Sequence, residues 1–125
     1  MRNTIILFLT ILVLASCQQS DTTLPPDGAA TIVLTNHTFT PTEITVTAGQ
    51  VLFFYNQDGT PLHILSESAI GLFDDTQDFD SGIITDNSFG TITIPESATA
   101  GDVFYFYDDL LRGSMATPDG TITVE

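Results

Sequence analysis

The sequence predicts an all-β protein, a Greek-key β-sandwich of about seven to eight strands. Three observations support this fold class. Short runs of alternating apolar and polar residues are separated by turn residues, and no segment indicates a helix. Phe and Tyr supply all aromatic residues, and threonine and isoleucine are frequent, which favours strands. The length of 125 residues suits one domain with a core of its own.

The first 16 residues have the architecture of an export signal. A single basic residue, Arg2, precedes an almost unbroken apolar run from Ile5 to Ala15. This run is shorter than the ~20 residues of a membrane-spanning helix, so a permanent span is the weaker alternative. Leu14-Ala15-Ser16-Cys17 resembles the lipobox of bacterial lipoproteins, in which the cysteine is acylated. We therefore expect a lipoprotein signal peptide over residues 1–16 and lipidation of Cys17, the only cysteine.

Residues 17–30 are interpreted as a flexible tether. The stretch is polar, lacks periodicity and contains Pro25-Pro26 and Asp27-Gly28. Gln18 implies, by the same resemblance, the outer membrane on its periplasmic side if the cell is Gram-negative. We thus expect an exported protein that a lipid anchor holds at the bacterial cell envelope. The folded domain is expected over residues 31–125.

The first half of that domain is predicted to contain four strands. Residues 31–35 and 43–47 form two of them, the second in strict alternation. Residues 51–56 are apolar on both faces, which predicts a central strand that is covered on both sides. Another strand starts at His63, and a long irregular segment with an acidic run leads to Gly82.

The second half is predicted to contain three strands. Residues 88–94 form one of them, with Ile92 and Ile94 directed inward and Thr91 and Thr93 directed outward. Residues 103–107 form an aromatic strand, which is expected to lie antiparallel to a last strand over residues 121–124. Pro118-Asp119-Gly120 supplies turn chemistry just before that last strand. The loop between the two strands is therefore held from both sides.

The charge balance argues against one class of partner. Two basic residues face sixteen acidic ones, for a formal net charge of −14. Such a surface repels phosphate backbones, so we expect no nucleic-acid partner. A basic envelope protein would be attracted to it at low salt, although solubility alone is the simpler explanation of the acidity.

A series of motifs runs through nearly all of residues 31–125. In chain order they are Phe39-x-Pro41, Ile44-x-Val46-x2-Gly49, Asn56-x-Asp58, His63, Phe79-Asp80-Ser81-Gly82, Phe104-x-Phe106-Tyr107, Met115 and Gly120-x-Ile122-x-Val124. Their order and spacing resemble the cupredoxin family, the plastocyanin-like small copper proteins. The resemblance implies a cupredoxin-like sandwich whose copper site lies around the loop after the aromatic strand.

The resemblance also implies a ligand set that this sequence only partly contains. The family binds copper with a histidine after the central strand, matched by His63, and with a Cys-x2-His-x2-4-Met run in the later loop. Asp108 stands at the cysteine position, Leu111 at the histidine position, and Met115 at an acceptable spacing for the axial ligand. A blue-copper centre needs a soft thiolate and two imidazoles. We therefore expect that the protein is not a blue-copper electron carrier.

A metal site of another kind is the alternative. Counting strand directions places the loops that hold His37, His63 and Asp108 at one end of the sandwich. With Asp109 as a substitute for Asp108 and with Met115, these residues would offer two imidazoles and an oxygen, a set that suits Cu(II) or Zn(II). The competing interpretation is that His63 hydrogen-bonds loop backbone and that His37 is an exposed loop residue.

Two further kinds of site lack support in the sequence. The acidic run Asp74-Asp75-x2-Asp78-x-Asp80 does not have EF-hand spacing, so a solvated loop is preferred to a calcium site. Ser66, His63 and Asp58 have no nucleophile-elbow context, so we expect no enzyme. The leading hypothesis is a lipid-anchored, non-enzymatic binding or structural module without a resident cofactor. The alternative is a copper-handling or redox protein with a non-standard site around His63 and Asp108.

Overall fold

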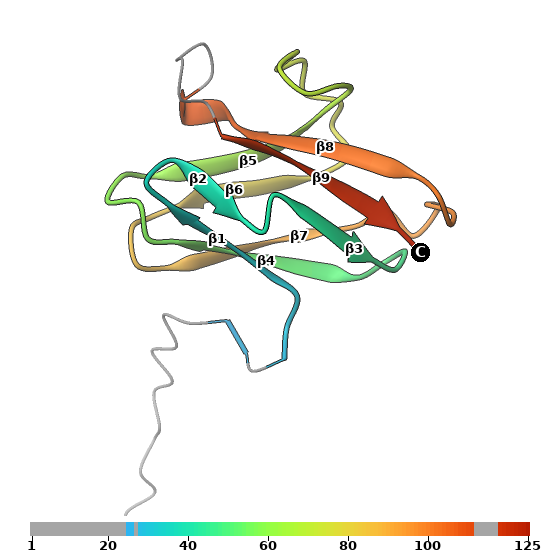
Figure 1. Cartoon of the computed structure of the whole chain (residues 1–125), viewed down its shortest axis with the longest axis horizontal. Helices are drawn as coiled ribbons and strands as arrows, with labels where there is room; N and C mark the ends of the chain where they lie inside the picture. The colour runs from blue at the N-terminus through green and yellow to red at the C-terminus, as the bar shows by residue number, and fades with distance from the viewer. Residues whose placement is uncertain (1–24, 27, 112–117) are drawn as a thin grey trace, which may run out of the picture.

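The structure is a computed structural model that describes residues 25–26, 28–111 and 118–125. Two sheets pack face to face, which confirms the predicted β-sandwich (Figure 1). The described part of the chain forms nine strands, and one 3-10 helix, η1, spans Asp109–Leu111. The strands are β1 (Thr31–Thr35), β2 (Thr38–Thr40), β3 (Glu43–Val46), β4 (Val51–Asn56), β5 (Leu62–Glu67), β6 (Asp80–Ile84), β7 (Phe89–Thr93), β8 (Val103–Asp108) and β9 (Asp119–Val124).

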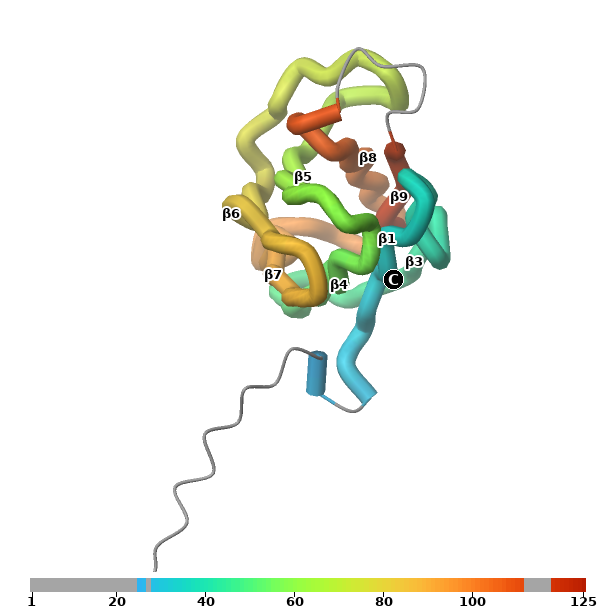
Figure 2. Tube along the Cα trace, turned by 90° about the vertical axis from the view of Figure 1, so that its left-hand side faces the viewer, coloured from blue at the N-terminus to red at the C-terminus, as the bar shows by residue number. Residues whose placement is uncertain are grey.

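The chain passes repeatedly between the two sheets. The first sheet has the strand order β2-β1-β4-β7, and the second has the order β3-β9-β8-β5-β6. β1 is parallel to β4 and β3 is parallel to β9, whereas the other neighbours are antiparallel. Figure 2, viewed along the strands, shows β4 and β7 in one layer and β5, β8 and β9 in the other. The antiparallel pairing of β8 with β9 was predicted from the alternation.

The hydrophobic core fills the space between the sheets, because one face of most strands is apolar. Phe39, Phe54 and Phe106 meet edge to face at its centre, with ring centroids 5.0 to 5.9 Å apart. The isoleucines around β7 point inward as predicted, since Ile92 and Ile94 are buried. Removing such side chains from water stabilises the sandwich by roughly 25 cal/mol per Å² of apolar surface.

The prediction for β4 was only half right. The strand is central, between β1 and β7, but it is not covered on both faces. Leu52 and Phe54 are fully buried, whereas Val51 is 43% exposed and Phe53 is half-buried. On the outer face of this sheet Phe53 lies beside Phe89, with ring centroids 5.4 Å apart, and both side chains stay partly exposed.

The predicted turn at Pro118-Asp119-Gly120 was wrong, because β9 already begins at Asp119. Gly120 lies opposite Phe106 in the β8–β9 ladder. A Cβ atom at Gly120 would meet Phe106 Cζ at 2.3 Å and the Thr42 carbonyl oxygen at 2.8 Å. Glycine is required here so that an aromatic ring and a backbone carbonyl can approach, and not so that the chain can turn.

Two strands of the structure, β2 and β6, were not predicted from the sequence. β2 follows β1 after a tight turn, and β6 begins inside the segment that was predicted to be irregular. β6 pairs with β5, and the register shifts between His63 and Leu65.

No helix in the described residues is long and apolar enough to span a membrane. The predicted signal peptide, Cys17 and Met115 lie outside the described residues.

Candidate functional site

Asp108, the residue at the predicted cysteine position, is fully buried at the end of β8. Its Oδ1 accepts the backbone N–H of His63 at 3.0 Å and that of Leu110 at 3.1 Å. One carboxylate oxygen therefore ties the start of β5 and η1 to the end of β8. Oδ2 is also buried, and within the described part of the chain it has no hydrogen-bond partner.

Burial raises the pKa of the Asp108 carboxyl, because removal from water disfavours its charged form. The N–H groups of His63 and Leu110 oppose this shift, and the carboxylates of Asp109 and Asp58 add to it. Both N–H groups are directed at Oδ1. A proton on Oδ2 would therefore leave both hydrogen bonds intact, which makes Oδ2 the favoured oxygen to carry it.

The backbone N–H of His63 contacts Asp108, but the imidazole ring of His63 faces two other carboxylates. Its Nε2 is 2.6 Å from Asp80 Oδ1, and its Nδ1 is 3.7 Å from Asp109 Oδ2. Asp80 Oδ1 also accepts the N–H of Gly82 at 2.8 Å. This hydrogen bond is the main reason that the pKa of Asp80 is lowered, and His63 contributes in the same direction. A metal ion could bind the Nε2 atom of His63 only by displacing Asp80.

His37 lies in the β1–β2 turn and binds an acid of its own. Its Nδ1 is 2.5 Å from Asp58 Oδ2, and its backbone N–H donates to Asp58 Oδ1 at 2.7 Å. The side chain of His37 is 43% exposed, whereas that of Asp58 is 2% exposed. Asp58 is held in turn by Asn56, whose Oδ1 accepts its N–H at 2.9 Å. The pair therefore links the β1–β2 turn to the loop after β4.

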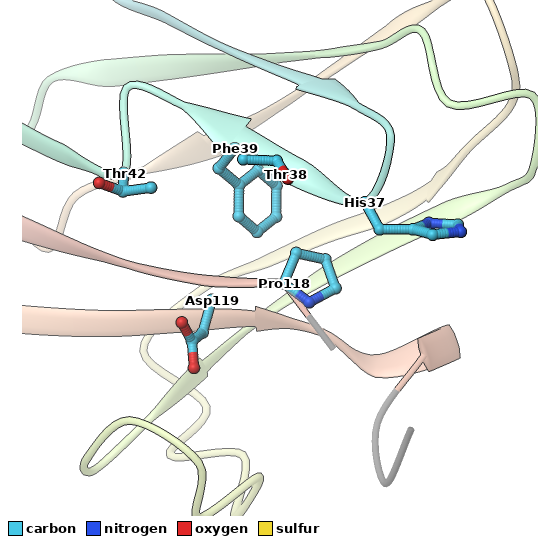
Figure 3. Close-up of a pocket in the computed structure, with 6 residues that line it drawn as sticks. All are labelled: His37, Thr38, Phe39, Thr42, Pro118 and Asp119. Atoms are coloured by element: carbon cyan, nitrogen blue, oxygen red, sulfur yellow. The ribbon is translucent and has the colours of Figure 1, made fainter. Parts of the chain in front are cut away.

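A small hollow of about 190 Å³ lies beside His37, between β2 and the start of β9. The residues that line it are His37, Thr38, Phe39, Thr42, Pro118 and Asp119 (Figure 3). In Figure 3 the ring of His37 points away from Phe39 and Pro118, and the carboxylate of Asp119 points away from Phe39. The hollow is thus walled by aromatic, hydroxyl and proline groups, and its two ionisable side chains do not face each other across it.

Three residues of the predicted metal site fall within the described part of the chain, namely His37, His63 and Asp108, and these three lie at one end of the sandwich without forming one cluster. Figure 1 shows the β1–β2 turn, the start of β5 and η1 at the same end. His63 is beside Asp108, whereas His37 contacts Asp58. The described residues contain no group of three or more His, Cys, Asp or Glu side chains placed to hold a metal ion. Because Met115 lies outside them, the four-residue site stays a prediction.

The acids that hold the two histidines were not predicted for that role. Asp58 is 21 residues from His37, and Asp80 is 17 residues from His63. Local sequence patterns, which relate residues a few positions apart, cannot predict contacts between residues so far apart in the chain. The only signal in the sequence was the presence of both acids in the motifs that resemble the cupredoxin family.

Comparisons with known proteins bear on the fold. No family model and no curated protein match the sequence. An oxidised mutant of amicyanin matches the structure with a TM-score of 0.59 at 15% identity, over 81% of this chain and 86% of the other. A purple cupredoxin from Nitrosopumilus maritimus matches with 0.60 at 20% identity, over 77% and 99%. Amicyanin from Paracoccus versutus matches with 0.58 at 16% identity, over 81% and 85%. These likenesses show a cupredoxin-like fold.

Proposed function

We propose that this protein uses its cupredoxin-like fold as a non-enzymatic binding or structural module of the bacterial cell envelope, held there by a lipid on Cys17. The observation that carries the proposal is the state of Asp108. This residue stands where a copper-binding thiolate is expected, and its carboxylate is buried and engaged by two backbone N–H groups. The position serves to join three segments of the fold.

The residues present do not fit a blue-copper centre. Such a centre needs a thiolate and two imidazoles around the metal. A carboxylate oxygen is a hard donor, and Leu111, at the second histidine position, has no donor atom in its side chain. Asp80 and Asp109 already face the ring nitrogens of His63. These residues therefore do not support electron transfer through a blue-copper centre.

Metal analysis and absorption spectroscopy of the purified protein test this proposal. We expect no bound copper after purification and no intense visible charge-transfer band after copper is added in excess. The Asp108→Cys variant serves as a matched comparison, because it restores the thiolate at the family position. An intense visible band in the unmodified protein would overturn the proposal.

A copper-handling or redox role around His63 and Asp108 is the second candidate, and one observation favours it. Oδ2 of Asp108 is a buried oxygen without a hydrogen-bond partner in the described residues, and a cation would satisfy it. His63 and Asp108 would then be the ligands to test. Copper or zinc should raise the thermal stability of the protein, and His63→Ala should abolish that increase. No thermal shift with either metal would remove this candidate.

The lipid anchor and the partner are separate parts of the proposal. Replacing Cys17 with serine should release the protein from the membrane fraction, and mass spectrometry of the mature protein should show the acyl modification on Cys17. Recovery of the Cys17→Ser variant in the membrane fraction would contradict anchoring through this residue.

The net charge of the chain bears on its partner. A formal net charge of −14 predicts a basic envelope protein as partner and an association that weakens steeply with salt.

A further inference from the structure

The loop between β5 and β6, residues 68–79, presents two large apolar side chains to solvent. Figures 1 and 2 both show this loop, in yellow-green, extending beyond the body of the sandwich. Ile70 is 52% exposed and Leu72 is 59% exposed, and only one residue separates them in the chain. Single exposed apolar residues are ordinary on protein surfaces, whereas grouped ones are typical of contact sites.

A buried carboxylate holds the tip of the loop in place. Glu67, the last residue of β5, is 3% exposed. Its Oε1 accepts the N–H of Gly71 at 3.3 Å, and its Oε2 accepts the N–H of Phe73 at 2.8 Å. Asp74 then closes the loop on its other side, because its Oδ1 accepts the N–H of Ser68 at 2.8 Å and its Oδ2 receives the Ser68 hydroxyl. Ile70 and Leu72 therefore stand on a fixed piece of backbone.

Phe73 anchors the same loop on the outer face of the second sheet. Its ring centroid lies 5.3 Å from that of Tyr107, which is fully buried. The φ angle of Phe73 is +52°, a left-handed conformation that a bulky residue rarely adopts. Of the three apolar side chains at the tip, only the Phe73 ring packs inward. The exposure of Ile70 and Leu72 thus follows from how the loop is held.

Acidic side chains adjoin this apolar pair. Asp74, Asp75 and Asp78 are all exposed on the loop, and the chain contains no lysine. Oδ1 of Asp75 accepts the N–H of Gln77 at 3.0 Å, so this acid too has a defined position. The surface at the loop tip therefore combines an apolar centre with fixed negative charge beside it.

We propose that the tip of the 68–79 loop is a docking surface for a protein whose contact face has an apolar centre bordered by lysine or arginine. The inference rests on the proposed function as a binding module and adds the surface and the chemistry of the partner. Charge complementarity selects this occupant. A second copy of so acidic a chain would bring like charges together, and the anionic phosphates of a lipid surface would be repelled.

A pair of synthetic peptides provides the test. One is a short amphipathic peptide of leucine and lysine, and the other has equal charge but serine in place of leucine. In two-dimensional NMR spectra, the leucine peptide should shift the backbone signals of residues 68–78 and leave those of β3 unchanged. The serine peptide should bind about tenfold more weakly, because it lacks the apolar contact. Salt should weaken both interactions.

Variants locate the contact. The double variant Ile70→Ser with Leu72→Ser should lower the affinity for the leucine peptide about tenfold. The matched control is Ile83→Ser with Val103→Ser, which removes two apolar side chains that are 59% and 43% exposed elsewhere on the domain. This control should bind as tightly as the unmodified protein. All of these side chains are exposed, so the fold should persist, and circular dichroism checks that it does.

Several results would overturn the proposal. They are absence of binding at low salt, equal affinity for the two peptides, and an equal loss in the control variant. Dimerisation that the loop variant abolishes would assign the tip to a second copy, and binding to phosphatidylcholine vesicles through the loop would assign it to lipid. The peptide test and the copper test are independent. If the peptides do not bind and the protein holds no copper, the docking surface is refuted and the proposed function stands. If copper gives an intense charge-transfer band, the proposed function is refuted whether or not the peptides bind.

Discussion

Substitution of Asp108 tests whether its carboxylate is a structural acceptor. Asp108→Ala leaves the N–H groups of His63 and Leu110 without the acceptor that they now share. A hydrogen bond contributes about 1–3 kcal/mol to stability, with the larger values for charged acceptors, so loss of both should lower the free energy of unfolding by about 2–6 kcal/mol. In a domain of this size 1 kcal/mol corresponds to roughly 4–8 °C, which predicts a Tm at least about 8 °C lower. Asp108→Asn keeps an oxygen acceptor and should lose less.

The pH dependence of the Asp108→Asn variant makes this prediction specific. The folded-state pKa of Asp108 is raised above its unfolded-state value, so ionisation of the carboxyl opposes folding. That cost is absent below the unfolded-state pKa of about 3.9 and grows as the pH rises through the folded-state pKa. The asparagine has no such group, and its stability relative to the unmodified protein should therefore rise over that window.

Urea unfolding followed by circular dichroism at several pH values measures these free energies for both variants. Glu43→Gln serves as the control, because Glu43 is exposed and accepts neither of the two N–H groups. A difference between the asparagine variant and the unmodified protein that stays constant from about pH 4 to about pH 8 would refute the role of burial. An alanine variant as stable as the asparagine variant would refute the role of the two hydrogen bonds.

Three further substitutions follow from other contacts. Gly120→Ala should lower the free energy of unfolding by about 1–3 kcal/mol, because its Cβ would overlap the ring of Phe106; unchanged urea unfolding would contradict this. Burial raises the pKa of Glu67, so Glu67→Gln should gain stability relative to the unmodified protein as the pH rises, and a gain on acidification would show the sign to be wrong. His37→Ala removes the partner of the buried Asp58 carboxylate and should cost about 1–3 kcal/mol, whereas an unaltered Tm would mean that solvent replaces the imidazole.

Local sequence patterns were sufficient to predict the strands in which apolar and polar residues clearly alternate. The isoleucines near β7 and the pairing of β8 with β9 were predicted because alternation assigns each residue to one face of a strand. Two predictions that rested on composition failed. The apolar residues on both faces of β4 predicted a strand covered on both sides, but one of these faces is half-exposed. The turn residues Pro118-Asp119-Gly120 predicted a turn, since the sequence does not distinguish a glycine needed for a turn from one needed for a close contact with Phe106.

The sequence by itself determined the fold class, and the presence of Asp108 where a thiolate would be needed. Both are properties of residue type and order along the chain, and they can be read without coordinates. Only the tertiary structure decided what Asp108, His63 and His37 contact. Those contacts join segments 17 to 45 residues apart, and they depend on which strands become neighbours and on how far each side chain is removed from water. The metal-ligand role of Asp108 stays a prediction, whereas the folded chain shows its carboxylate as a buried acceptor that joins β5 and η1 to the end of β8.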